Sequence, residues 1–136
     1  MVRALLADHN ISGQVYLLVK ILESPQWQDL WSSLNLPLWT FRSLGLLPTV
    51  SDAVLWHVCQ QQQVVLITAN RNASDPDSLE ATIRAFNTPN SLPVFTLANA
   101  GRIFPSKIYA EKTAVKMLDY LLNMDRILGT GRLYIP

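Results

Sequence analysis

The sequence has a single cysteine, few glycines and few charged residues, and each scarcity excludes a class of protein. Cys59 has no second cysteine to pair with, which excludes an intrachain disulfide and a zinc site built from several cysteines. The five glycines form no Gly-x-Gly-x-x-Gly run, so a dinucleotide-binding loop of that type is excluded. We therefore expect a reducing compartment and assign Cys59 to the core.

Charge of either sign is also scarce. Charged residues make up 15% of the chain, against roughly 25% in an average soluble domain, and the net charge is +1. Without an overall basic field, contact with nucleic acid has to come from a local patch. The hydrophobic content of 49% predicts a large buried fraction or an apolar surface that binds a partner.

Long hydrophobic runs are absent. No stretch approaches the ~18 consecutive apolar residues of a membrane span, and the first residues resemble a strand more than a signal peptide. We therefore expect a cytoplasmic protein with no membrane segment.

Strand-like and helix-like patterns alternate along the chain. The run Val64–Thr68 is the strongest strand, because continuous β-branched and leucine residues are typical of a strand buried on both faces of a parallel sheet. We place the others at Val2–Ala7, Leu38–Phe41 and Val94–Leu97, with Leu133–Ile135 as a final edge strand or a docking tail.

Helical spacing of apolar residues fills the intervals between these strands. Thr49 and Asp52 have capping-box spacing, and Pro76 suits the first turn of the helix that carries Leu79, Ile83 and Phe86 inward. In the last helix Ile108, Val115, Leu118 and Leu122 are expected on the buried face. The expected helices are Ile11–Glu23, a short one through Trp27–Leu34, Thr49–Gln63, one opened by Asp75-Pro76-Asp77, and Pro105 to about Met124.

This alternation predicts parallel βαβ units with right-handed crossovers and helices on both faces of the sheet. The expected fold is one α/β domain over residues 1–136, a three-layer sandwich around a mainly parallel sheet of four to five strands, with a C-terminal tail at about 129–136. Such a sheet binds ligands beyond the carboxyl ends of its strands.

Polar side chains stand at those ends. Asp8 follows the first strand, Asn70 and Asn72 follow the third, and Asp52 lies in the first turn of the helix before it. Carboxylate and amide oxygens gathered at one edge suit Mg²⁺ or Mn²⁺, which activates water and neutralises a scissile phosphate. Arg71 and Arg102 are candidate phosphate-binding residues near the same edge, because arginine forks pair with phosphate oxygens; scattered surface charge is the alternative for both. 

The order and spacing of these residues resemble the PIN-like family of bacterial domains, relatives of the toxin ribonucleases in toxin–antitoxin pairs. The resemblance covers roughly residues 3–100 and is carried by Leu5-Leu6-Ala7-Asp8-His9-Asn10-Ile11-Ser12, by Leu44-Gly45-Leu46 with Ser51-Asp52 at a helix start, and by Val64 to Asn72. It implies a PIN-like fold, metal-dependent endoribonuclease activity that hydrolyses phosphodiester bonds with Mg²⁺ or Mn²⁺, an RNA substrate and an antitoxin partner.

The family pattern assigns roles to four positions. Asp8 and Asp52 match two of its acids, and the third strand of the family ends in Thr-x-Asp-x-Asp, where this chain has Thr68, Asn70 and Asn72. The resemblance thus implies a catalytic set of Asp8, Asp52, Asn70 and Asn72, with Asp8, Asp52 and Asn70 as metal ligands. An amide brings no negative charge, so the two asparagines predict weaker or absent metal binding.

Each candidate also has a structural alternative. Asp8 is a good helix cap, and Asp52 suits a capping box. Asn70 and Asn72 are common turn residues. A role in a site therefore does not follow from residue type alone.

Three functions remain open at this point. The first is a metal-dependent ribonuclease of the toxin–antitoxin type with a partly degenerate acidic site. The second is a catalytically inactive PIN-like domain that binds a protein or RNA partner. The third, compatible with either, is a homodimer or higher oligomer whose interface includes Trp27 and Trp31.

Overall fold

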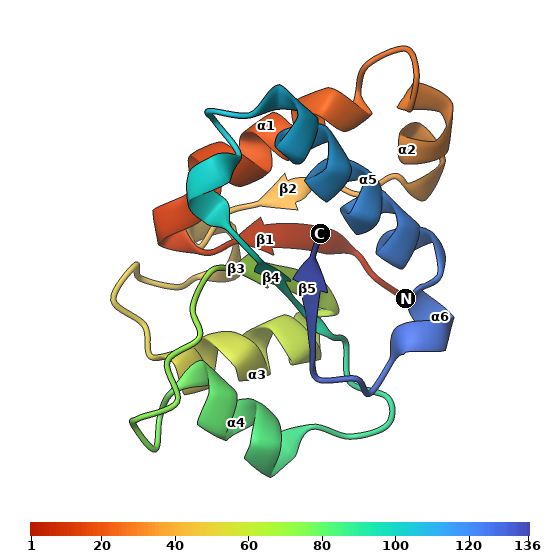
Figure 1. Cartoon of the computed structure of the whole chain (residues 1–136). Helices are drawn as coiled ribbons and strands as arrows, with labels where there is room; N and C mark the ends of the chain where they lie inside the picture. Colours follow the sequence, from red (N-terminus) through yellow and green to blue (C-terminus); the bar gives the residue numbers. More distant parts are fainter.

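In the computed structural model, which describes residues 1–136, all strands belong to one parallel sheet with the order β2-β1-β3-β4-β5 (Figure 1). The expected mainly parallel sheet of an α/β domain is confirmed. The C-terminal segment is a strand, since it pairs with β4, and Gly129 and Gly131, both at φ +81°, turn the chain into it. The strands are β1 Ala4–Ala7, β2 Leu38–Trp39, β3 Val64–Thr68, β4 Val94–Leu97 and β5 Arg132–Ile135.

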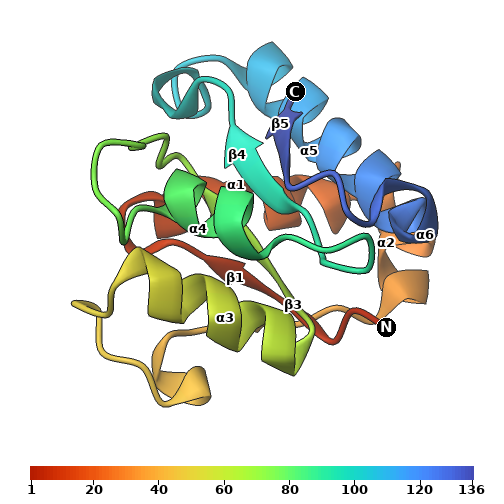
Figure 2. The same ribbon diagram turned by 90° about the horizontal axis from the view of Figure 1, so that it is seen from below.

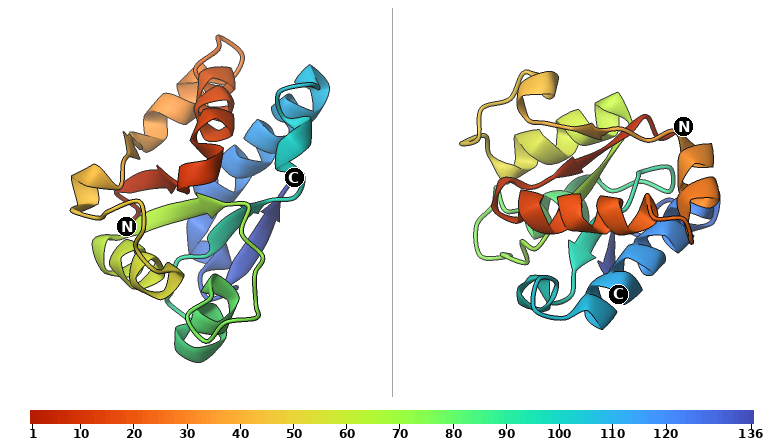
Figure 3. Two further views of the ribbon diagram at one scale, coloured as in Figure 1. Left: turned by 90° about the vertical axis from the view of Figure 1, so that its left-hand side faces the viewer. Right: turned by 90° about the horizontal axis from the view of Figure 1, so that it is seen from above.

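Helices cover both faces of this sheet. The longer helices are α1 Ser12–Leu22, α2 Gln28–Leu34, α3 Asp52–Gln62, α4 Leu79–Phe86 and α5 Lys107–Leu122, followed by the short α6 Met124–Ile127. Single 3-10 turns, η1 His9–Ile11, η2 Arg42–Leu44 and η3 Ala100–Arg102, complete the set. In the left view of Figure 3 the strands run between α1, α2 and α5 on one side and α3 and α4 on the other. Seen from below, α3 and α4 lie in front of the sheet (Figure 2).

Alternating strand residues build two cores. In β1, Leu5 faces the core under α1 and α5, whereas Leu6 faces the core under α3 and α4. β3 repeats the pattern with Val65 and Leu66. Because both faces are covered, every residue of β1 and β3 is buried, which is why these segments lack polar alternation in the sequence.

Two helices begin at serine N-caps, of which the sequence indicated only Ser51, through the resemblance. The hydroxyl of Ser51 accepts from the Val54 N–H at 3.2 Å and caps α3, so the predicted Thr49–Asp52 capping box is wrong. The hydroxyl of Ser78 accepts from the Ala81 N–H at 3.1 Å and caps α4. The helix therefore begins at Leu79, after the predicted Asp75-Pro76-Asp77 opening, and Ser78 takes the cap position.

The buried face of α5 differs from the expected one. Leu118 is buried as predicted, but Ile108 is 72% exposed and Leu122 is exposed too. The helix packs beside α1, and its buried residues are Tyr109, Ala110, Thr113, Ala114, Met117, Leu118 and Leu121. The buried face is therefore turned around the helix axis from the one that the pattern favoured.

Trp31 of α2 and Trp27, which precedes this helix, pack in the core. Trp31 is 8% exposed and belongs to the core under α1 and α5, and Trp27 packs against the same cluster. Trp31 is therefore unavailable as the oligomer interface that the sequence suggested. None of the helices combines the length and the apolar character needed to cross a bilayer.

Candidate functional site

The candidate site lies beyond the carboxyl ends of β1 and β3, the two strands from which the chain leads to opposite edges of the sheet. From β1 the chain crosses to β2 on one side, whereas from β3 it crosses to β4 on the other. Doubly wound sheets of this order bind ligands in the crevice that the two crossovers leave. The N–H of Asp8 donates to the Ile67 carbonyl at 2.8 Å, which brings the end of β1 beside β3.

A pocket of about 410 Å³ occupies this crevice and brings together three of the four predicted catalytic residues. Asp8, Asp52 and Asn70 all line it, although they lie on three different segments of the chain. The remaining wall residues are His9, Asn10, Ile11, Phe41, Pro48, Val50, Leu55 and Ala69. The convergence expected from the sequence is therefore present.

Asp8 is held by its own neighbour and by a threonine of β3. Its Oδ1 accepts from the His9 N–H at 2.8 Å, which caps η1. Its Oδ2 accepts from the Thr68 hydroxyl at 2.7 Å, and Thr68 is 0% exposed. The same hydroxyl oxygen accepts from the Asn70 N–H at 2.9 Å. Asp8 thus acts as a cap through one oxygen and links β1 to β3 through the other.

Asp52 is held by two distant segments. Its Oδ2 accepts from the Asn70 side-chain Nδ2 at 2.8 Å and from the Leu79 N–H at 3.3 Å. Asp52 therefore does not stabilise its own helix as a capping-box acid. Its carboxylate joins α3 to the loop after β3 and to the start of α4.

The contacts of Asn70 determine how its amide is oriented. Nδ2 donates to Asp52, and Oδ1 accepts from the Asn72 N–H at 2.9 Å. A rotation of the amide by 180° would set oxygen against the Asp52 carboxylate and NH₂ against the Asn72 N–H, breaking both bonds. Asn70 therefore presents a donor, and not its oxygen, to the carboxylate in the pocket.

Asn72 lies outside the pocket. Its side-chain oxygen accepts from the N–H and the hydroxyl of Ser74 at 3.0 and 2.7 Å, and the residue is exposed. Such bonds to a residue two positions ahead are those of an Asx turn. The turn alternative describes the contacts of this side chain. Asn72 contacts Asn70 through its backbone N–H but does not line the pocket with Asp8, Asp52 and Asn70.

The two candidate phosphate-binding arginines also lie away from the pocket lining. The Arg71 guanidinium donates to the carbonyls of Leu97, at 3.1 Å, and Ala98, and lies 5.1 Å from the Tyr134 ring. Arg102 lies 4.4 Å from the Tyr109 ring. No lysine or arginine lines the pocket, so its charge comes from Asp8 and Asp52.

The sequence patterns do not single out Arg132, which contacts the Asn70 backbone next to the pocket. Its Nη1 donates to the Asn70 carbonyl oxygen at 2.8 Å and to Thr96 Oγ1 at 2.7 Å, and its Nε pairs with Glu80 at 3.1 Å. A single arginine in an edge strand carries no sequence signal for burial. Only the docking of β5 onto β4 encloses it.

Cys59 of α3 is buried and does not line the pocket. Burial and, to a smaller extent, the negative charge of Asp8 together raise the pKa of Cys59 to about 12. A raised pKa keeps the thiol protonated at neutral pH, which disfavours Cys59 as a nucleophile. The predicted core role of Cys59 is confirmed.

As arranged in the structure, the pocket offers a divalent cation two carboxylates and no side-chain amide oxygen from Asn70. Mg²⁺ and Mn²⁺ prefer oxygen ligands, chiefly carboxylates. Of the predicted ligands, Asn70 turns its nitrogen toward Asp52 and commits its oxygen to Asn72. No group of three or more His, Cys, Asp or Glu side chains lies close enough to hold a metal ion.

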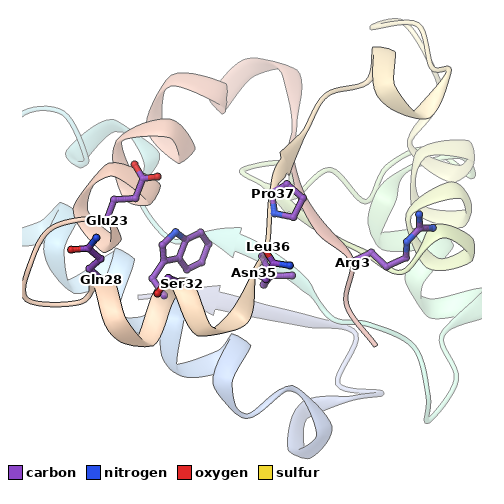
Figure 4. Close-up of a pocket in the computed structure, with 8 residues that line it drawn as sticks. Arg3, Glu23, Gln28, Ser32, Asn35, Leu36 and Pro37 are labelled. Atoms are coloured by element: carbon purple, nitrogen blue, oxygen red, sulfur yellow. The ribbon is translucent and has the colours of Figure 1, made fainter.

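A larger pocket, of about 770 Å³, lies at the opposite, amino end of β1 and β2. Figure 4 shows Arg3 and Glu23 at its two ends. The Arg3 guanidinium is engaged by Gln62 Oε1 at 3.3 Å and by the Trp39 ring at 5.1 Å. Parallel sheets bind ligands at the other edge, and this pocket gathers no reactive constellation.

No family model, no curated protein and no solved structure matches this chain.

Proposed function

We propose that this chain is a PIN-like domain that has exchanged a catalytic divalent cation for an internal hydrogen bond, and that its pocket binds a basic side chain of a protein partner. The parallel α/β sandwich and the acids at its carboxyl edge support the PIN-like assignment. The sequence resemblance over roughly residues 3–100 also supports that assignment.

The observation that carries the proposal is the 2.8 Å bond from Asn70 Nδ2 to Asp52 Oδ2. The PIN-like pattern has an aspartate at this position. Two carboxylate oxygens so close together require a cation or a shared proton between them. The amide supplies an N–H instead, and a hydrogen bond to a charged acceptor stabilises by about 1.5–3 kcal/mol. The site is therefore complete without a metal ion.

The charge of the pocket decides between classes of partner. A phosphate of RNA would meet Asp8 and Asp52 with no compensating cation in the lining, and this repulsion disfavours RNA. A lysine or arginine side chain has the complementary charge. Phe41 offers an aromatic face to the cation, and Val50 and Leu55 offer apolar surface to its methylene stem. An antitoxin or other protein with an exposed basic side chain fits these features.

Calorimetric titration of Mn²⁺ tests the loss of the metal. We expect no saturable binding by the wild type and saturable binding by Asn70→Asp, because that variant restores a carboxylate opposite Asp52. Adding Asp52→Asn to the variant should abolish the gain. Saturable binding by the wild type that disappears in Asp8→Asn and Asp52→Asn would contradict the proposal.

Titration of a short arginine peptide, followed by NMR shifts, tests the binding of a basic group. We expect saturable binding that weakens with added salt and disappears in the Asp8→Asn/Asp52→Asn protein. The matched control is Asp75→Asn/Asp77→Asn, which removes two exposed carboxylates outside the pocket lining. Equal losses in both double variants would assign the attraction to general surface charge.

A metal-dependent ribonuclease is the second candidate, favoured by the presence of Asp8 and Asp52 in one pocket. Its test is cleavage of single-stranded RNA in the presence of Mn²⁺, with Asp8→Ala as the comparison. Cleavage by the wild type that is lost in this variant would make the ribonuclease the better assignment.

A further inference from the structure

We propose that Arg132 is a positioning residue for the pocket, because its guanidinium holds both segments that donate to Asp52. This inference deepens the proposed function and rests on it, because both concern the same pocket.

One guanidinium contacts three elements. Nη1 donates to the carbonyl oxygen of Asn70 at 2.8 Å, and Asn70 is the residue whose amide reaches Asp52. Nε donates to Glu80 Oε1 at 3.1 Å, and Glu80 follows Leu79, whose N–H is the second donor to Asp52. Nη1 also donates to Thr96 Oγ1 at 2.7 Å, which anchors the arrangement on β4.

The geometry of arginine suits this task. The planar guanidinium presents Nε and Nη1 at a fixed angle, so the distance between the loop after β3 and the start of α4 is set by one rigid group. The Arg132 side chain is 8% exposed, which leaves little room for water to replace a lost contact. A lysine carries all its donors on one freely rotating nitrogen and cannot hold Glu80 and Asn70 at the same fixed spacing.

The unpartnered Nη2 indicates that stability alone does not explain this arginine. Nη2 is buried and has no hydrogen-bond partner. A buried donor without an acceptor costs free energy, and replacing a buried ion pair by apolar residues is often neutral or stabilising. The retained contacts are those of Nε and Nη1, the two nitrogens that hold the segments facing Asp52.

The test is the coupling between Asp52 and Asn70, measured by a double-mutant cycle of urea unfolding. The cycle compares Asp52→Ala, Asn70→Ala and the double variant, first with Arg132 and then with Arg132→Lys. With Arg132 we expect a coupling of about tenfold in the unfolding equilibrium constant, the order of a hydrogen bond to a carboxylate. With Arg132→Lys it should fall to about twofold or less, because Asn70 and Leu79 are no longer held in place.

A merely structural arginine gives a different result. It would lower the stability of all four proteins by the same factor and leave the coupling at about tenfold, and that outcome would overturn the proposal. The matched control is Arg84→Met, because Arg84 is exposed and pairs with Glu80 at 3.4 Å without contacting Asn70. The coupling should be unchanged in this variant.

Glu80→Gln provides a second route if Arg132→Lys does not fold. It removes the charged partner of Nε while leaving the guanidinium in place. The coupling should fall in Glu80→Gln and not in Arg84→Met, and equal coupling in these two would overturn the proposal. No ligand enters the cycle, so a failure of the proposed function, seen as Mn²⁺ binding by the wild type, does not change its outcome.

Discussion

The two carboxylates that line the pocket are held in different ways. Asp8 bonds to the residue that follows it and to Thr68 on the adjacent strand. Asp52 bonds to Asn70 and Leu79, 18 and 27 positions away, and Arg132 holds both of those segments. Strand register therefore builds the Asp8 side of the pocket, whereas packing of a loop against two helices and β5 builds the Asp52 side. The Asp52 side should be the more sensitive to substitution.

Asn70→Asp should change the free energy of unfolding most, because it removes the hydrogen bond to Asp52 and leaves the contacts of Asp8 in place. Without divalent ions at neutral pH, we expect a loss of about 3 kcal/mol in the free energy of unfolding, from a lost charge-assisted bond and a new like-charge contact. The native variant retains a proton that the unfolded chain releases above about pH 4. Relative to the wild type, the stability of the variant is therefore highest below that pH and falls as the pH rises toward neutrality.

Urea unfolding in EDTA across this pH range measures the effect of Asn70→Asp. Asn72→Asp is the matched control, since it places a carboxylate in the same loop but outside the pocket. Equal pH profiles for the two variants would show that Asn70 and Asp52 do not share a site.

Thr68→Val should act on the Asp8 side of the pocket and lower the free energy of unfolding by about 2 kcal/mol. The substitution keeps the shape of the side chain but leaves Asp8 Oδ2 and the Asn70 N–H without their partner. Thr113→Val is the control, because Thr113 is equally buried and its hydroxyl only donates to the Tyr109 carbonyl in the same helix. Thermal or urea unfolding checks the difference, and equal losses would argue against the link between Asp8 and β3.

The pH dependence of stability tests the surroundings of Cys59 on the Asp8 side, because the charge of Asp8 contributes to the raised pKa of this thiol. Its pKa is raised from 9.0 to about 12 by burial and by Asp8, so above pH 9 the unfolded chain loses a proton that the native protein keeps. The free energy of unfolding should then fall by about 1.4 kcal/mol per pH unit between pH 9 and 11, relative to Cys59→Ala. Parallel stability curves for the two proteins would place Cys59 in a wetter environment than the structure does.

Asn72→Ala should have the smallest effect. Its bonds to Ser74 are exposed, so we expect a change below about 0.5 kcal/mol. Mn²⁺ binding by Asn70→Asp should be unaffected when Asn72→Ala is added. A loss of that binding would restore Asn72 to the predicted site.

Most of the fold was predictable, because burial on both faces of a parallel sheet leaves continuous apolar runs such as Val64–Thr68. The Ser78 cap and the buried face of α5 were not. Ser78 caps a helix start at which several neighbouring polar residues are equally suitable in sequence. The exposure of Ile108 depends on how closely α5 approaches its neighbours, which no periodicity records.

The sequence by itself determined the α/β class, the strand positions and the gathering of Asp8, Asp52 and Asn70 at one edge. These follow from local hydrophobic pattern and from the rule that parallel strands end together. Only the tertiary structure decided that Asn70 turns its nitrogen to Asp52 and that Arg132 holds Asn70 and Glu80. Both depend on hydrogen bonds between distant segments, whose directions are set when the strands and helices pack together.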